Sequence, residues 1–201
     1  EEAHCPNISE CWSRGTATFI ILGDICSRRC RFCAIQKGKP AEPDFSEPLR
    51  IAESIAKMKL RHSVITSVTR DDLSDGGAEI WANTILETRK LNPNTTIEVL
   101  IPDFEGKTEL YQKVFKCKPD ILNHNIETVQ RLYSTVRPQA NYQNSLKLLK
   151  DAKEFGLKTK TGLMVGIGES KEEIFDCFKD LRKINVDIVT IGQYLQPTEK
   201  H

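Results

Sequence analysis

The sequence lacks a marked excess of charge of either sign and any apolar run of membrane-spanning length. Its 201 residues hold 29 Lys and Arg against 28 Asp and Glu, for a formal net charge of +1. Overall charge therefore favours neither a nucleic-acid partner nor a membrane surface. The first residues do not resemble a signal peptide. With 39% hydrophobic and 28% charged residues, we expect a soluble, intracellular protein with one main domain.

Seven cysteines is an odd number, and their placement is more informative than their count. A disulfide-rich secreted domain is usually shorter, with cysteines spread along its length. Here five fall within the first 33 residues: Cys5, Cys11, Cys26, Cys30 and Cys33. In an intracellular protein such a cluster at one end indicates metal binding. Cys177 lies on an apolar helical stripe, and Cys117 lies near a predicted helix end, so we interpret both as packed structural residues.

The hydrophobic pattern alternates between strand-like and helix-like periods along the chain. Strands are expected at residues 17–23, 63–68, 95–102, 120–125, 158–166 and 187–194. Helices are expected at residues 48–60, 78–91, 107–116, 142–155 and 171–184. Ser170 with Glu173 forms a capping box, Asn141 is a good N-cap, and Gly156 is a typical helix stop. Six strands alternating with five helices predict an α/β fold with a parallel sheet covered by helices.

Two architectures satisfy this alternation: a full or partial βα barrel, or an open doubly wound sheet. Polar and glycine-rich segments follow the ends of successive strands. They are the cysteine loop, Asp75–Gly77, Asp103, Asn125 with Glu127, Gly168 with Glu169, and Gln193 with Gln196. Because barrel enzymes place their chemistry at the carboxyl ends of the strands, this distribution favours a partial TIM barrel of about six parallel strands with outer helices.

The most specific motif is the loop Cys26-Ser-Arg-Arg-Cys30-Arg-Phe-Cys33, of the form C-x3-C-x2-C. Three closely spaced thiolates can hold three irons of a 4Fe–4S cluster and leave the fourth iron without a protein ligand. The alternative is a structural zinc site, but that usually needs paired C-x2-C knuckles and only one is present. The spacing therefore favours iron and sulfur. Arg28, Arg29 and Arg31 of this loop are solvated charges, screen an anionic cluster, or dock an acidic partner.

The loop C-x3-C-x-Phe-Cys resembles the signature of the radical S-adenosylmethionine (SAM) superfamily. The surrounding residues resemble the lipoyl synthase family in particular. The matching segments are residues 10–12 (ECW), 16–19 (TATF), 66–77 (TSVTRDDLSDGG), 124–128 (HNIET), 162–169 (GLMVGIGE) and 192–198 (GQYLQPT). They run in the family's order over nearly the whole chain.

This resemblance implies a sulfurtransferase that inserts two sulfur atoms, at C6 and C8, into a protein-bound octanoyl chain. It implies two 4Fe–4S clusters and SAM, whose reductive cleavage yields a 5′-deoxyadenosyl radical able to attack unactivated carbon. The implied partners are an octanoylated lipoyl carrier domain or H protein, and an electron donor such as flavodoxin or ferredoxin. Two alternatives remain: a biotin synthase-like sulfur-inserting enzyme, and a non-catalytic iron–sulfur or zinc protein.

The resemblance assigns Cys26, Cys30 and Cys33 to the SAM-binding cluster and Cys5 and Cys11 to an auxiliary cluster. Contacts with SAM are expected from seven further residues: Phe32, Gly76, Gly77, Asn125, Glu127, Arg137 and Gly166. Among these, Asn125 and Glu127 could hold ribose hydroxyls, and Arg137 could pair with the SAM carboxylate. His124 is expected to be packed rather than to act as a ligand.

Two departures from the family concern the ends of the chain. The auxiliary motif is C-x4-C-x5-C, and only Cys5 and Cys11 are present; the family's C-terminal Arg-Ser-Ser-Tyr stretch is also missing. We expect the chain to be part of a longer protein; an inactive relative without the second cluster is the alternative. Residues 1–16 would be the auxiliary-cluster segment and residues 17–201 the barrel domain. The expected location is the bacterial cytoplasm, or an organelle matrix in a eukaryote.

Overall fold

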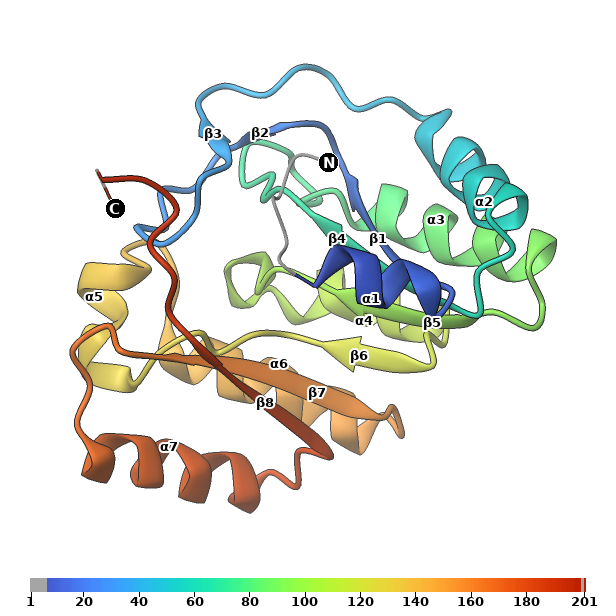
Figure 1. Ribbon diagram of the computed structural model, residues 1–201. Coiled ribbons are helices and arrows are strands. Elements are labelled where there is room, and N and C mark those ends of the chain that lie inside the picture. Colours follow the sequence, from blue (N-terminus) through green and yellow to red (C-terminus); the bar gives the residue numbers. More distant parts are fainter. Residues whose placement is uncertain (1–6, 200) are drawn as a thin grey trace.

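A computed structural model describes residues 7–199 and 201. Its main feature is a six-stranded sheet in the order β1-β4-β5-β6-β7-β8, in which every neighbouring pair is parallel. The strands are β1 (Thr16–Ile21), β4 (His62–Ser67), β5 (Thr96–Leu100), β6 (Ile121–Asn123), β7 (Thr159–Val165) and β8 (Ile188–Gln193). Each overlaps one predicted strand. The predicted partial barrel is confirmed, with β1 and β8 at the two edges of the sheet (Figure 1).

Helices connect successive strands and lie outside the curved sheet (Figure 1). The five predicted helices are present as α2 (Glu47–Lys57), α3 (Ala78–Leu91), α4 (Thr108–Lys116), α6 (Tyr142–Glu154) and α7 (Lys171–Lys183). The predicted caps form as well, since the Asn141 side chain accepts from the N–H groups of Gln143 and Asn144. Ser170 and Glu173 complete the capping box of α7. These contacts satisfy backbone donors that a helix start leaves unpaired.

Several short elements were not predicted from the sequence. They are α1 (Ile8–Ser13), β2 (Ile25–Cys26), β3 (Gln36–Lys37), the 3-10 turns Phe104–Gly106 and Gln130–Leu132, and α5 (Tyr133–Val136). Each is too short for a hydrophobic period to be detected. Among the described residues, no helix is both long and apolar enough to span a membrane.

The core fills the space between the sheet and its helices. Strand residues such as Ile65 and Ile97 are fully buried against helical residues such as Trp81 and Phe115. Cys177 is 2% exposed and packs in a second cluster under α7, as predicted. Cys117 is partly buried against the main core. Because the outer faces of the strands are committed to packing, their carboxyl ends and the loops beyond them are left to form a site.

Candidate active site

The cysteine loop lies beyond the carboxyl end of β1. Cys26 is the last residue of β2, which pairs in parallel with β3, so the chain between Cys26 and Gln36 is drawn into a closed loop. Within it, the Cys33 N–H donates to the Cys30 carbonyl over 3.3 Å. The loop therefore brings its three cysteines to the end of the barrel where catalytic residues are usually found.

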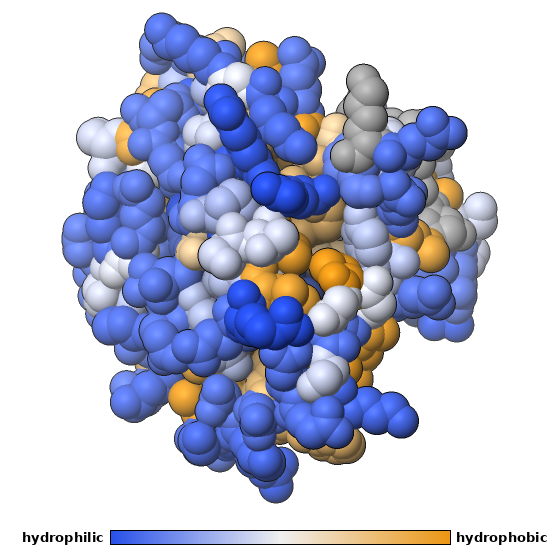
Figure 2. Space-filling model, turned by 90° about the vertical axis from the view of Figure 1, so that its left-hand side faces the viewer, coloured by the Kyte–Doolittle hydropathy of each residue, from blue (hydrophilic) through white to orange (hydrophobic). Residues whose placement is uncertain are grey.

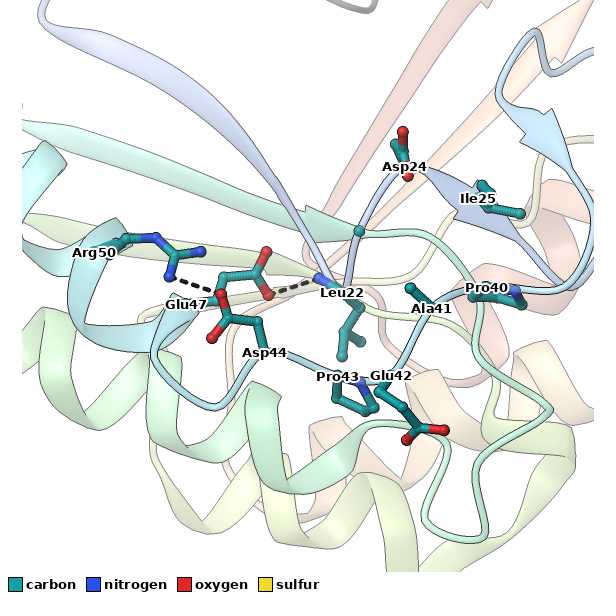
Figure 3. A pocket seen from close by; sticks show the side chains of 11 residues that line it. Leu22, Asp24, Ile25, Pro40, Ala41, Glu42, Pro43, Asp44, Glu47 and Arg50 are labelled. Atoms are coloured by element: carbon teal, nitrogen blue, oxygen red, sulfur yellow. Dashed lines mark hydrogen bonds and ion pairs between the residues drawn. The ribbon is translucent and has the colours of Figure 1, made fainter.

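The segment that leads from β1 into this loop is fixed at Leu22, which has a positive φ of 69°. A Glu47 carboxylate oxygen accepts from the Leu22 N–H over 2.8 Å, as Figure 3 shows. The buried Arg70 guanidinium donates to the Leu22 carbonyl over 3.2 Å. Both backbone groups of the strained residue are thus held. The hollow beside it, of about 240 Å³, lies between residues 22–25 and 40–44.

A cavity of about 250 Å³ opens at the centre of the barrel mouth. Figure 2 views this end of the molecule and shows hydrophobic side chains at the bottom of a hollow with a hydrophilic rim. The three loop cysteines line the cavity together with four other predicted site residues: Phe32, Asn125, Glu127 and Arg137. Apolar side chains such as Ile20, Ile35 and Leu100 complete the wall. Seven residues that were predicted to act together are therefore brought to one place.

The pKa values of Cys30 and Cys33 are affected by burial and by neighbouring cysteines. Burial raises the pKa of Cys30, the Arg137 charge opposes that rise, and the Cys33 and Cys26 thiols add to it. Burial also raises the pKa of Cys33, with a contribution from Cys26. Three thiolates at this place would repel one another unless a bound cation compensates them. This donor set therefore suits a positively charged iron centre, which binds thiolates in deprotonated form.

No group of three or more His, Cys, Asp or Glu side chains that could hold a metal ion is found among residues 7–199 and 201. Three thiolates that each bind a different iron of a 4Fe–4S cluster stand around the cluster and do not converge on one point. The common cavity lined by all three cysteines is the feature that fits such a cluster.

Arg137 brings a positive charge to this cavity. It is 8% exposed, and its Nη1 donates to the Asn125 carbonyl over 2.9 Å and to the Tyr133 hydroxyl over 3.2 Å. Its buried Nε has no hydrogen-bond partner in the described part of the chain. A buried guanidinium with an unused donor is suited to an anionic group. The predicted contact with a carboxylate stays a prediction, and the orphan donor supports it.

Glu127 lines the same cavity as Arg137 and carries the opposite charge when ionised. Its backbone has a positive φ of 65° and is bound to β7, donating to the Gly162 carbonyl and accepting from the Met164 N–H, both over 2.9 Å. Burial raises the pKa of Glu127, while Arg137 and a hydrogen bond from Asn125 lower it. The strained backbone fixes a carboxylate next to an amide, a pair that can accept from and donate to vicinal hydroxyls.

His124 lines the cavity but is occupied on both ring nitrogens. Nδ1 lies 2.8 Å from the Ile101 carbonyl oxygen and Nε2 lies 2.9 Å from the Ser145 hydroxyl. Burial, together with the nearby Arg137 charge, lowers the pKa of His124 to about 4. His124 is therefore a neutral packed residue, as the sequence analysis expected.

Gly76 and Gly77 are not among the residues that line the cavity. They form the turn before α3, with positive φ angles of 59° and 82°. A Cβ on Gly77 would come within 2.6 Å of the Leu22 side chain. The turn and its packing thus explain both glycines without a ligand. Their contact with SAM remains a prediction that this placement does not support.

The cavity wall next to β4 is formed by Thr66, Ser67, Val68 and Thr69. These four residues are not among the predicted site residues, which include the glycines that follow them in sequence. The signal that could have found them was their place at the carboxyl end of a buried strand. Gly166 also lies outside the cavity lining, in a turn where its N–H and that of Ile167 donate to the Glu169 carboxylate.

Cys11 and the cysteine loop belong to different elements of the fold. Cys11 belongs to α1, which precedes β1, whereas Cys26 follows the opposite end of that strand. The six residues of β1 at about 3.3 Å each separate the two ends by roughly 20 Å. Cys5 lies outside the described residues. Cys11 is therefore not part of the loop that holds the triad, and its assignment to an auxiliary cluster stays a prediction.

Charged residues around the loop divide into two groups. Arg29 and Arg31 are exposed, but Arg28 is only 4% exposed, so a solvated or partner-docking role for Arg28 is wrong. Arg70 pairs with Asp72 at 2.9 Å. Asp75 accepts from the Gly77 and Glu79 N–H groups at the start of α3.

The chain matches the family model described as the Radical SAM superfamily over residues 20–192. It resembles several solved radical SAM enzymes in fold. Streptococcus suis SuiB bound to S-adenosylmethionine has a TM-score of 0.73 at 14% identity, with 96% of this chain and 45% of that chain covered. Methylornithine synthase (PylB) has a TM-score of 0.69 at 13% identity, covering 90% of this chain and 53% of that chain.

Much closer relatives are curated lipoyl synthases. The protein of Caldanaerobacter subterraneus subsp. tengcongensis is 56% identical over 100% of this chain and 71% of its own length. That of Nitrosospira multiformis is 56% identical over 100% of this chain and 65% of its length. A mitochondrial lipoyl synthase of Nematostella vectensis is 54% identical over 98% and 68%. The chain spans about two thirds of the length of these relatives, and it belongs to the lipoyl synthase family of radical SAM enzymes, which catalyse sulfur insertion with 4Fe–4S clusters and SAM.

Proposed function

We propose that this chain is the catalytic barrel of a lipoyl synthase that inserts sulfur at C6 and C8 of an octanoyl chain attached to a carrier protein. The observation that carries the proposal is the single cavity lined by Cys26, Cys30, Cys33 and Arg137 at the mouth of the barrel. Family membership supplies the reaction; the cavity supplies a place for it.

In this proposal the three thiolates hold three irons of a 4Fe–4S cluster and leave one iron open to the amino and carboxylate groups of SAM. The bound cluster and SAM together supply one-electron chemistry that can remove hydrogen from an unactivated carbon. The free Nε of Arg137 would donate to the SAM carboxylate, and Asn125 with Glu127 would hold the ribose hydroxyls. The apolar wall formed by residues such as Ile20 and Leu100 would keep water from the reactive centre.

Cys11 and Cys5 are proposed ligands of the auxiliary cluster that donates sulfur. Cys11 belongs to α1 and not to the loop that holds the triad, which supports a separate centre. Residues 1–16 then form the auxiliary-cluster segment and residues 17–201 the barrel domain. Oxygen-sensitive clusters favour a reducing compartment, so we place the enzyme in a bacterial cytoplasm or an organelle matrix. A flavodoxin or ferredoxin would deliver the electron.

The experiment is an assay of the anaerobically reconstituted full-length protein, of which this chain is expected to be a part, with SAM, a reductant and an octanoyl-lysine peptide. We expect 5′-deoxyadenosine and a peptide with two added sulfur atoms, measured by mass spectrometry. A protein that binds iron and sulfide but neither binds nor cleaves SAM would contradict the proposal and favour a non-catalytic iron–sulfur protein.

A further inference from the structure

One arginine of the cysteine loop faces the interior of the protein. The Arg28 side chain is 3% exposed, whereas Arg29 and Arg31 next to it are exposed. Arg28 stands between Cys26 and Cys30, two of the proposed cluster ligands. A buried charge persists only where partners compensate it, so its contacts indicate what the loop is attached to.

Arg28 is held by two carboxylates. Its Nε donates to Asp71 Oδ2 over 2.6 Å, and its Nη2 donates to Asp71 Oδ1 over 3.0 Å. The same Nη2 donates to Asp103 Oδ1 over 2.6 Å. A planar guanidinium can satisfy this fork of acceptors, and a lysine ammonium cannot.

The two carboxylates come from the loops that follow neighbouring strands. Asp71 follows β4 and Asp103 follows β5. Asp103 is 1% exposed, and its Oδ1 also accepts from the Glu105 N–H over 3.0 Å, so it is itself fixed. Arg28 therefore ties the cysteine loop to two strands of the rigid sheet.

The contacts around Arg28 continue to the sulfur of Cys26. Ser27 Oγ donates to the Thr69 carbonyl over 2.9 Å and accepts from the Asp71 N–H over 3.0 Å. In this register, Cys26 Sγ accepts from the Thr69 N–H at 3.3 Å and from the Arg28 N–H at 3.4 Å. The hydrogen bonds to the first thiolate thus depend on where the loop lies against β4.

We infer that Arg28 is the positioning residue that locks the cysteine loop onto the ends of β4 and β5, so that three thiolates are presented to the cluster and Cys26 keeps its N–H donors. The inference rests on the proposed function, because it takes the triad to bind a cluster. Hydrogen bonds to cluster sulfurs stabilise the more negative, reduced form and so raise the reduction potential. Without the lock, the cluster is held less tightly and has a more negative potential.

Arg28→Lys and Asp71→Asn test this inference, with Arg29→Ala as the matched control. Arg28→Lys keeps the charge and loses the fork; Asp71→Asn weakens the fork at its more exposed side, where the aspartate side chain is 22% exposed. After anaerobic reconstitution, iron retention against a chelator is measured. The reduction potential of the cluster is measured by a redox titration in which EPR detects the reduced form. We expect retention to fall roughly 10- to 100-fold in both variants and the potential to move to more negative values. Arg29→Ala should match the parent in both measurements.

The outcomes distinguish failure of the proposed function from failure of the inference about Arg28. A parent protein that takes up no cluster would overturn the proposed function. A loaded parent with Arg28→Lys and Asp71→Asn variants that match it in retention and potential would overturn the role of Arg28 alone. Circular dichroism of each variant before reconstitution identifies any variant that fails to fold. If Arg28→Lys fails to fold, Asp71→Asn, which leaves the Asp103 contact in place, keeps the inference testable.

Discussion

Lys160 of β7 and Glu98 of β5 form an ion pair across the intervening strand β6, with 2.8 Å between Nζ and Oε1. Asn123 of β6 donates to the same oxygen over 3.1 Å. Glu98 is 3% exposed. Burial alone would raise the pKa of Glu98, but hydrogen bonds from His62 and Lys160 lower it to about 2. Four strands are thereby joined through one carboxylate.

Replacing Lys160 with Met should destabilise the fold, because it leaves the buried Glu98 carboxylate with fewer partners. Loss of one member of a buried pair costs about 3 kcal/mol, and less here since His62 and Asn123 remain. Chemical denaturation of the cluster-free protein measures this. Lys150→Met, which removes only an exposed pair with Glu154 at 3.7 Å, should change the free energy of unfolding by less than about 0.5 kcal/mol. Equal effects of the two substitutions would show that the interior pair adds nothing.

His124 predicts a dependence of stability on pH. Its pKa in the folded protein is about 4, below the ordinary value of 6.5, so the unfolded chain binds the proton more readily. The contribution of neutral His124 to the free energy of unfolding is fully present above pH 6.5. It is lost as pH falls from 6.5 towards 4, and it totals roughly 3 kcal/mol. His124→Asn should flatten the stability curve in that window, as measured by denaturation of the cluster-free protein. A parent-like slope in this variant would assign the acid sensitivity to other groups.

The order of strands and helices could be predicted from the sequence because the strands are short apolar runs and the helices have a helical period with their own cap residues. The cysteine triad could be found for a related reason: its ligands lie within eight residues. By contrast, Arg28 finds its carboxylates 43 and 75 residues further along the chain. No local pattern marks those pairings. Gly76 and Gly77 were predicted to contact SAM but lie outside the cavity lining, because turn glycines and ligand-binding glycines look alike in sequence; their contact with SAM stays a prediction. Thr66–Thr69 line the cavity but lack any distinguishing residue type.

Cys11 should not be required for SAM cleavage. Replacing Cys5 and Cys11 together with Ala removes proposed ligands of the auxiliary cluster but leaves the loop triad intact. We expect 5′-deoxyadenosine to be formed still, and the lipoyl product to be absent. Iron analysis of the reconstituted full-length parent, which would supply the remaining ligands, should show two clusters per chain, and that of the full-length variant should show one. Sulfur insertion retained by the double variant would mean that the donor lies elsewhere.

Arg29 and Arg31 are the exposed charges of the loop and are suited to an acidic carrier. Arg29→Glu with Arg31→Glu should raise KM for a whole octanoylated carrier domain, because encounter between opposite charges is steered electrostatically. KM for a short neutral octanoyl-lysine peptide should stay unchanged. In the parent, added salt should raise KM for the domain more steeply than for the peptide.

The substrate itself gives a second control for the carrier. Free octanoate should not be turned over, since the cavity opens at a protein surface where a carrier can present its acyl arm. Equal turnover of free octanoate would contradict the carrier assignment. Identical salt responses of domain and peptide would remove only the role of Arg29 and Arg31.

The most direct test of the central claim is SAM cleavage by Cys30→Ala. Cys30 lines the cavity with Cys26, Cys33 and Arg137, and in this account it binds one iron of the SAM-binding cluster. Cys117→Ala, outside that cavity, is the matched control. After anaerobic reconstitution and reduction, the parent and Cys117→Ala should form 5′-deoxyadenosine from SAM and Cys30→Ala should form none. Cleavage by Cys30→Ala at the parent's rate would contradict the account.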